Sequence, residues 1–302
     1  MSSQASQTPD LVCLGSLMID LTGQDRTDSI ESTTTYRRAL GGACANVAAT
    51  ATRLGCRTAI ISRVGADAFG HFTQAELRRL GINADWLQID PKVTSSVIFL
   101  PGGSIDRDFL LIRGADQHLH LTDAARAMLR AARALHTTTF ALSQEPCRSA
   151  AIEAIEIAHA AGHIVSLDPN FRERSWPDSK ELMPLLRHLL PLTTVIKPSL
   201  QDAEAIWGPG QTPGDYIEQF HAHGARQIML TLGREGVVVS DGRTIERIAA
   251  IPLDVANTSG VGDAFTAAAI TALLHGETLT GAARLGTIVA SYRLRNPDRA
   301  AP

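Results

Sequence analysis

The sequence is poor in cysteine and has no pattern that pairs its cysteines. Four occur in 302 residues, at positions 13, 44, 56 and 147, and no C-x-x-C spacing is present. Such spacing is typical of zinc sites and redox motifs, so neither is expected. A chain of this length can bury a large core without disulfides, and we expect free, partly buried thiols in a reducing compartment.

Long hydrophobic runs are also lacking. The longest apolar stretch, Ala264 to Leu274, is too short and too interrupted for the ~20 apolar residues of a membrane-spanning helix. Residues 1–10 are polar and lack the charged start and apolar segment of a secretory signal. The sequence therefore predicts a soluble, cytoplasmic protein with no membrane partner.

An excess of one charge sign is absent as well. The formal net charge is −3, with 28 Lys and Arg against 31 Asp and Glu. The arginines are scattered, and no long basic run provides the electrostatic footprint of a nucleic-acid-binding protein. Nucleic acid is therefore not an expected partner, whereas a small anionic substrate can still be bound by a few local arginines.

Helical and extended patterns alternate through most of the chain. Such alternation is typical of a doubly wound, mostly parallel sheet flanked by helices, the α/β class. The apolar stretch 11–14, which ends at Gly15, has the character of a buried parallel strand. The expected helices are 41–54, 69–80, 122–133, 149–161 and 179–190, and the expected strands are 58–62, 134–138, 163–167, 194–196, 226–232, 236–240 and 244–248, before two closing helices.

Two β-rich pieces, 16–40 and 94–113, do not fit this alternation. The first contains a Thr-rich stretch, 29–38, which is typical of a strand on a polar surface. The second contains P-G-G-S at 101–104 between two extended runs, which is a hairpin signal. We expect one α/β domain over 1–302 with these pieces as a small β-sheet lid, because ligands of such folds bind beyond the carboxyl ends of the strands.

A glycine-rich segment lies close to the end of the chain. Residues 257–263 have the sequence N-T-S-G-V-G-D and lead into an alanine-rich helical run. Glycine lets the backbone approach a ligand closely, and the first N–H groups of a helix attract anions. The carboxylate there, Asp263, is either a helix cap or a base beside a bound phosphate. The segment is not a dinucleotide fingerprint, because the third glycine is missing.

A second glycine-rich segment, G-G-A-C-A-N at 41–46, is followed by Gly55 and Gly65. Alone it is compatible with a tight turn before a helix, or with close approach of a ligand whose hydroxyls Asn46 binds. Together with the segment that ends at Asp263, it resembles the paired signatures of the ribokinase-like (PfkB) carbohydrate kinases.

This resemblance covers the chain from Leu11 to about Tyr292, and it implies the ribokinase-like fold and an ATP-dependent kinase activity. Asp263 would be the catalytic base, and the N–H groups before it would stabilise the transferring phosphoryl group. The anion-hole residues implied by the resemblance are Gly260, Val261 and Gly262.

The first strand is followed by G-S-L-M-I-D at 15–20. An aspartate just past a strand end is either a loop cap or an acceptor for two hydroxyls of a diol. The arrangement resembles the first substrate loop of the family, in which Asp20 would hold the sugar. The further sugar contacts implied by the resemblance are Gly41, Gly42 and Asn46.

The segment D-P-N-F-R at 168–172 resembles one found in fructokinase-like and 2-keto-3-deoxygluconate-kinase-like members. By composition alone it is a loop with an exposed arginine. Arg113 lies where those members place an arginine from the lid side. Because two converging arginines can bind a carboxylate by forked hydrogen bonds, Arg113 and Arg172 favour a keto-deoxy sugar acid as substrate, although fructokinase-like enzymes carry a similar loop.

The segment K-P-S-L-Q-D at 197–202 begins another helix. Ser199 is a plausible N-cap, and Asp202 three residues later completes a capping arrangement. The family usually has Asn and Glu at these two positions, in an N-x-x-E motif tied to Mg²⁺ and the phosphates. If that role persists, Asp202 would act on magnesium through water.

The segment T-L-G-R-E-G at 231–236 links two expected strands, as a hairpin turn would. It resembles the T-x-G-x-x-G of the family, which lies against the nucleotide phosphates. At Asn257 the family most often has an Asp that helps to bind a monovalent cation, so activation by such a cation is not expected. The residues expected to contact ATP are Lys197, Ser199, Thr231, Gly233 and Gly236.

The sequence therefore predicts an ATP- and Mg²⁺-dependent kinase of a sugar or keto-deoxy sugar acid, of the 2-keto-3-deoxygluconate or fructose type. Two alternatives are a ribokinase- or nucleoside-kinase-like specificity, and a non-catalytic sugar-binding protein of the same fold. The resemblance also implies a homodimer formed through the lid.

Overall fold

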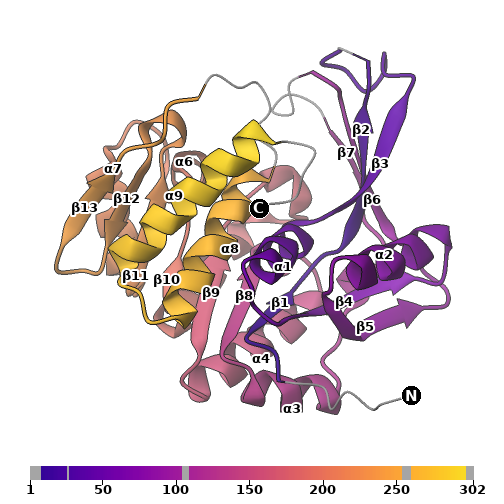
Figure 1. The fold of residues 1–302 in the computed structure, drawn as a ribbon, viewed down its shortest axis with the longest axis horizontal. Helices are drawn as coiled ribbons and strands as arrows, with labels where there is room; N and C mark the ends of the chain where they lie inside the picture. The colour runs from indigo at the N-terminus through magenta and orange to yellow at the C-terminus, as the bar shows by residue number, and fades with distance from the viewer. Residues whose placement is uncertain (1–7, 26, 104–108, 254–259, 297–302) are drawn as a thin grey trace.

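The computed structural model describes residues 8–25, 27–103, 109–253 and 260–296 (Figure 1). Asn257, at which the sequence departs from the monovalent-cation pattern, lies outside these residues. No helix within the described ranges is both long and apolar enough to cross a membrane.

A nine-stranded sheet forms the centre of the molecule, in the order β13-β12-β11-β10-β9-β8-β1-β4-β5 (Figure 1). All neighbours from β11 to β5 pair in parallel, whereas β12 and β13 add an antiparallel edge. The strands are β1 (Leu11–Leu14), β4 (Thr58–Gly65), β5 (Asn83–Asp90), β8 (Ala134–Thr138), β9 (Ile164–Asp168), β10 (Val195–Ile196), β11 (Gln227–Thr231), β12 (Val237–Ser240) and β13 (Ile245–Ile248).

Helices cover both faces of this sheet, because alternate residues of its strands are buried on opposite sides. Val12 and Leu14 of β1 belong to the core under α3, α4, α5 and α7, while Leu11 and Cys13 belong to the core under α1 and α8. The helices are α1 (Ala43–Arg53), α2 (Ala68–Arg79), α3 (Asp123–Ala131), α4 (Cys147–Ala160), α5 (Leu182–Leu189), α6 (Leu200–Trp207), α7 (Pro213–Ala222), α8 (Val261–Leu274) and α9 (Leu279–Arg295).

A separate four-stranded sheet stands beyond the carboxyl end of β1, with the order β3-β2-β6-β7 (Figure 1). The chain enters it four residues after β1 and leaves it at Gly41, directly before α1. Its position therefore follows from its two short connections to the large sheet. The strands are β2 (Met18–Gly23), β3 (Tyr36–Gly41), β6 (Ser96–Leu100) and β7 (Leu110–Ile112).

The α/β fold with a large parallel sheet and a small second sheet confirms the predicted fold class. The Thr-rich stretch 29–38 was predicted as a strand, but β3 covers Tyr36–Gly41 instead. The residues before it form turns, in which the Asp25 carboxylate accepts hydrogen bonds from the backbone N–H groups of Thr34 and Thr35. Such side-chain bonds compete with strand pairing.

The last two helices form an antiparallel pair that starts and ends at the same edge of the large sheet (Figure 1). A Cβ added at Gly286 of α9 would lie 2.8 Å from the ring of Phe265 in α8. Glycine at this position therefore lets the two helix backbones approach closely. As a result, the C-terminal end of α9 lies beside the N-terminal end of α8.

Gly236 is sterically required at the turn between β11 and β12. Its φ of +94° favours glycine, and a Cβ there would collide with the carbonyl oxygen of Ile248. We expect Gly236→Ala to lower the free energy of unfolding by about 2–4 kcal/mol in urea titrations. Gly233→Ala is the matched control, because Gly233 also has a positive φ, +59°, but open space around the added Cβ. Equal losses in the two variants would contradict the steric argument.

Candidate active site

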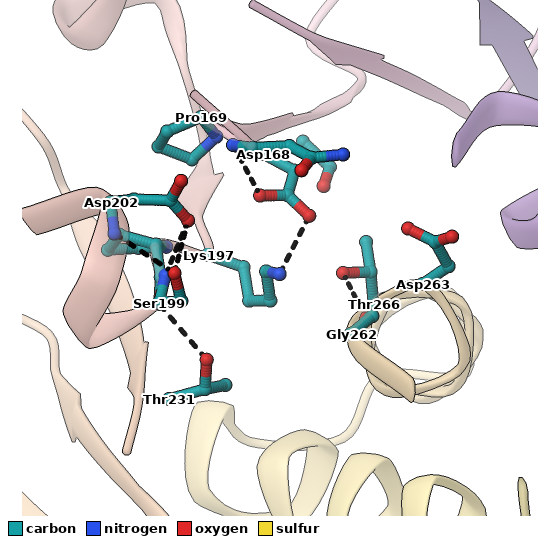
Figure 2. Close-up of polar contacts among 12 residues, drawn as sticks. Asp168, Pro169, Lys197, Ser199, Asp202, Thr231, Gly262, Asp263 and Thr266 are labelled. Carbon is teal, nitrogen blue, oxygen red and sulfur yellow. Dashed lines mark hydrogen bonds and ion pairs between the residues drawn. The ribbon is translucent and has the colours of Figure 1, made fainter. Parts of the chain in front are cut away.

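The carboxyl ends of the parallel strands bring the predicted motifs to one edge of the large sheet. Gly15 follows β1, Asp168 ends β9, Lys197 follows β10 and Thr231 ends β11. The first turn of α8, with Asp263, faces the same edge (Figure 2). Sites of open α/β sheets lie at this edge, because the loops that leave the strands converge there.

Asp263 lies in the first turn of α8 and contacts the first turn of α1. The Asn46 side-chain amide donates a hydrogen bond of 2.8 Å to the Asp263 carboxylate. The structure thus joins the two glycine-rich segments, which are more than two hundred residues apart in the sequence. Burial raises the pKa of Asp263, while the Asn46 hydrogen bond and the charges of Lys197 and Arg293 act against this rise. A half-buried carboxylate of this kind is suited to accept a proton.

Gly260 and Gly262 shape the N-terminus of α8. Gly260 caps the helix in a left-handed conformation, with φ +70° and ψ +7°. A Cβ added at Gly262 would lie 3.2 Å from the Lys197 ammonium nitrogen. This cation therefore lies beside the first helical N–H groups, and together they make a surface suited to an anion such as a phosphate.

Lys197 pairs with Asp168 in a buried ion pair, at 2.7 Å between the ammonium nitrogen and a carboxylate oxygen (Figure 2). Burial alone would lower the pKa of Lys197, but the neighbouring carboxylates, Asp168 first, raise it. Burial raises the pKa of Asp168 to about 6, against the opposing effect of Lys197. The pair therefore keeps the lysine charged at the edge of the sheet, in front of α8.

Asp20 lies on β2, with its carboxylate over the backbone of Gly41 on the neighbouring strand β3. Any Cβ at Gly41 would collide with this carboxylate, and a Cβ at Gly42 would collide with the carbonyl oxygen of Ser16. Burial and the charge of Asp263 raise the pKa of Asp20 to about 7. Among the described residues the Asp20 carboxylate has no hydrogen-bond partner, so its acceptor oxygens remain available to a ligand.

Ser199 and Asp202 form a complete capping box at the start of α6 (Figure 2). The Asp202 side chain accepts bonds from the backbone N–H of Ser199 at 2.9 Å and from its hydroxyl at 2.6 Å. Its other oxygen accepts from the backbone N–H of Phe171 at 2.7 Å. Three of about four lone-pair positions of this buried carboxylate are thus in use.

Thr231 lies next to this capping box. Its backbone N–H donates to the carbonyl oxygen of Pro198 at 2.9 Å, and the two segments form a bridge between Ser199 and Thr231. Gly233 begins the short 3₁₀ turn that follows, and Gly236 ends it against Ile248. The structure therefore places the two predicted nucleotide segments side by side.

The two predicted arginines each have a carboxylate partner of their own. Arg113 lies 3.0 Å from Asp116, donates to the Ser143 hydroxyl at 2.5 Å and stacks over the Phe140 ring. It is buried, and one of its terminal nitrogens has no partner among the described residues. Arg172 is 45% exposed and lies 3.6 Å from Asp202.

Two features of this site were not predicted from the sequence. The Asp168–Lys197 pair joins residues on adjacent parallel strands, and only the strand order reveals it. Arg293, in the last turn of α9, lies with its Nε 3.5 Å from where a Cβ of Gly260 would be. Within the described ranges, no group of three or more His, Cys, Asp or Glu side chains could hold a metal ion.

The comparison with known proteins agrees with this geometry. Residues 8–301 match the pfkB family carbohydrate kinases. The ATP-dependent 6-phosphofructokinase of Thermoanaerobacterium thermosaccharolyticum is 29% identical over 287 residues, which cover 95% of this chain and 88% of that protein. The fructokinase of Escherichia coli is 34% identical over 236 residues, which cover 77% of this chain and 76% of that protein.

The fold has close counterparts among solved structures. The fructokinase of Halothermothrix orenii superposes with a TM-score of 0.83 at 34% identity, covering 92% of this chain and 97% of that one. The match to the family spans nearly the whole chain and includes the described site residues. The chain therefore belongs to the pfkB family of carbohydrate kinases, phosphotransferases that act on the hydroxyl groups of sugars.

Proposed function

We propose that this kinase transfers the γ-phosphoryl group of ATP to a hydroxyl of a neutral ketose of the fructose type. The observation that carries the proposal is the Asp263 carboxylate, bonded to Asn46 and facing the cation of Lys197 at the start of α8. Several of the curated relatives that match most of the chain are named fructokinases, which supports the sugar class.

Asp263 accepts the proton of the attacking sugar hydroxyl, and its raised pKa suits this role near neutral pH. The N–H groups of Gly260, Val261 and Gly262 stabilise the charge on the transferring group. MgATP, when bound, supplies that phosphoryl group. Asn46 orients the Asp263 carboxylate through its 2.8 Å hydrogen bond and keeps one oxygen free to accept the proton.

The sugar lies between Asp20 and the start of α1. Asp20 accepts hydrogen bonds from two of its hydroxyls, and the absence of a Cβ at Gly41 leaves the Asp20 carboxylate room to lie over the backbone there. The small sheet, which carries Asp20, acts as a lid that keeps water away from the phosphoryl group. A homodimer formed through this lid, and a cytoplasmic location, remain predictions.

The surroundings of the two arginines favour a neutral sugar over a keto-deoxy sugar acid. Asp116 offsets the charge of Arg113, and Asp202 lies close to the charge of Arg172. A substrate carboxylate would have to compete with these partners, whereas hydroxyls can use the remaining N–H group of Arg113.

The nucleotide phosphates would lie along the adjacent segments of Ser199 and Thr231. In the turn that follows, Gly233 leaves open space beside the backbone and Gly236 packs against Ile248. Lys197, which lies beside Gly262 in the first turn of α8, would face the terminal phosphate. The Asp202 oxygen that accepts from Phe171 also lies 3.6 Å from Arg172, so a magnesium-bound water would share this oxygen with the arginine. Asp202 would then hold Mg²⁺ through that water.

Asp263→Asn should abolish turnover while the protein still folds and binds ADP. We expect a fall in kcat of about 10³-fold or more, because a positioned general base contributes about 10²–10⁴-fold. The measurement is ADP release with MgATP against fructose, fructose 6-phosphate, 2-keto-3-deoxygluconate, ribose and nucleosides. Asp123→Asn, at a fully exposed carboxylate, is the control. If another compound of this set gave much faster ADP release than fructose, the proposed sugar class would be rejected.

Asp20→Asn should stabilise the protein at alkaline pH. Asp20 has a pKa of about 7 in the folded protein, against about 3.9 in the unfolded chain. Its contribution to the free energy of unfolding therefore falls as the pH rises from 4 past 7. At pH 8.5 we expect a gain of up to about 4 kcal/mol over the wild type in thermal unfolding, and no gain at pH 4.

The same variant should lose sugar binding, because an amide cannot accept two hydroxyl bonds as a carboxylate does. Asp85→Asn, at an exposed position, is the control for stability. A pH dependence of unfolding that is equal in Asp20→Asn and the wild type would show that Asp20 is an ordinary carboxyl.

Asp202→Asn should raise the Mg²⁺ concentration for half-maximal velocity by about tenfold or more, as expected when an outer-shell group of a metal is lost. It should also destabilise the protein by about 1 kcal/mol through the capping box. Asp215→Asn is a matched control, because Asp215 holds the same capping position in α7, with Thr212 as its partner. Identical Mg²⁺ dependence in both variants would leave Asp202 with a capping role alone.

A further inference from the structure

Arg293 is carried to the proposed phosphoryl-transfer site by the helix pair α8–α9. Helix α8 leads away from the carboxyl edge of the sheet, and α9 returns to it and ends at Arg295 (Figure 1). Gly286, against the ring of Phe265, sets the close spacing of the two helices. The last turn of α9 therefore lies beside the glycine that caps α8.

The guanidinium of Arg293 lies close to the anion-hole backbone. A Cβ built on Gly260 would lie 3.5 Å from its Nε and 3.6 Å from one of its terminal nitrogens. The same point lies 3.8 Å from the side-chain nitrogen of Asn46, which bonds Asp263. The positive charge of Arg293 acts on Asp263, where it opposes the rise in pKa caused by burial. The arginine is thus electrostatically part of this site.

We propose that Arg293, beside Gly260, is a second cationic contact of the transferring phosphoryl group, in addition to Lys197 beside Gly262. The inference rests on the proposed function, since it assigns one more residue to the same reaction. Gly260 is the left-handed N-cap of α8, and Gly262 lies in the first turn of the helix. Arg293 lies near Gly260 and Lys197 near Gly262, and the two cations therefore both lie at the helix N-terminus.

The chemistry of the step needs positive charge at this place. The sugar oxygen forms a bond to the γ-phosphorus, the bond from that phosphorus to the β,γ-bridging oxygen breaks, and Asp263 takes the hydroxyl proton. Charge is spread over the three equatorial phosphoryl oxygens during this exchange. Arg293 keeps its own proton, because a guanidinium group is not deprotonated in proteins, and acts as a charged donor to one or two of these oxygens.

A purely structural role predicts a different behaviour. Basic side chains in the last turn of a helix interact favourably with its negative end and its free carbonyls. Arg295 shares the last turn of α9 with Arg293 but is exposed to solvent. If Arg293 served the helix end alone, replacing either arginine would have similar consequences.

The test compares Arg293→Gln with Arg295→Gln by calorimetric binding of MgAMP-PNP and MgADP. We expect Arg293→Gln to weaken AMP-PNP, which carries the terminal phosphoryl group, by about tenfold or more relative to ADP, while Arg295→Gln leaves this ratio at the wild-type value. A ratio in Arg293→Gln equal to that in Arg295→Gln overturns the proposal. If Arg293→Gln does not fold, Arg293→Lys allows the same comparison, with a smaller change in ratio expected because lysine lacks the forked donor geometry.

A second readout is the pH dependence of kcat/KM, in particular its acid limb, where kcat/KM falls as Asp263 becomes protonated. Arg293→Gln removes a charge that lowers the pKa of Asp263, so the limb should move to higher pH, and kcat should fall by about 10²-fold or more. An unmoved limb counts against the proposal. The groups that act on Asp263 and remain in place include Asn46 of α1, Lys197 after β10, Arg172 after β9, Asp168 of β9 and Asp20 of β2.

The failure of this inference is distinguishable from the failure of the proposed function. A wild type that binds neither nucleotide and phosphorylates no sugar rejects both. A wild type that phosphorylates a sugar, with Arg293→Gln and Arg295→Gln alike in every readout, rejects the role of Arg293 alone.

Discussion

Asp20, Asp168 and Asp263 lie in one poorly solvated region beyond the carboxyl ends of the strands, and the burial of their charge is the constraint on which the rest of the site depends. Burial raises the pKa of Asp20 to about 7 and that of Asp168 to about 6, and it raises the pKa of Asp263 as well. An isolated buried carboxylate would remain protonated and could not act as a base. The neighbouring cations and donors therefore determine whether the site can work near neutral pH.

Each carboxylate meets this constraint in a different way. Asp168 is paired with Lys197, which itself needs the carboxylate to stay charged in a buried position. Asp263 has the Asn46 amide on one oxygen and the charges of nearby basic side chains around it, so ionisation is made easier without a direct ion pair. Among the described residues Asp20 has neither, and its raised pKa reflects burial together with the charge of Asp263.

Much of the fold was predictable from the sequence, because its signals are local. The spacing of apolar residues and the turn residues identify the alternating helices and strands. The strands of the small sheet lie in the two β-rich pieces, except that β3 extends to Gly41. The strand β5, Asn83–Asp90, was missed because its mixture of polar and apolar residues suits a sheet edge and gives no continuous apolar run. The residues 29–35 were predicted as part of a strand, because their hydrogen bonds to the Asp25 side chain leave no pattern to detect in the sequence.

The site was predictable where one short segment carries the chemistry, and less so where distant segments meet. The capping box of Ser199 and Asp202 was one of two alternatives, and the structure shows it. The spacing of charges in the sequence does not indicate that Arg293 lies near Asp263. Its position beside Gly260 depends on the close approach of α9 to α8 at Gly286.

The arginines show why residue types alone do not determine the substrate. Two arginines near a sugar site suggest a carboxylate clamp, but a clamp requires guanidinium groups whose charge is not already offset. Asp116 and the Ser143 hydroxyl hold Arg113 in place, and one of its terminal nitrogens has no partner among the described residues. Asp202 contacts both Ser199 in the cap of α6 and Arg172, so it links the segment 168–172 to the segment 197–202. In the proposed function, the charge of the substrate therefore depends on these acidic partners, Asp116 and Asp202, as well as on the arginines themselves.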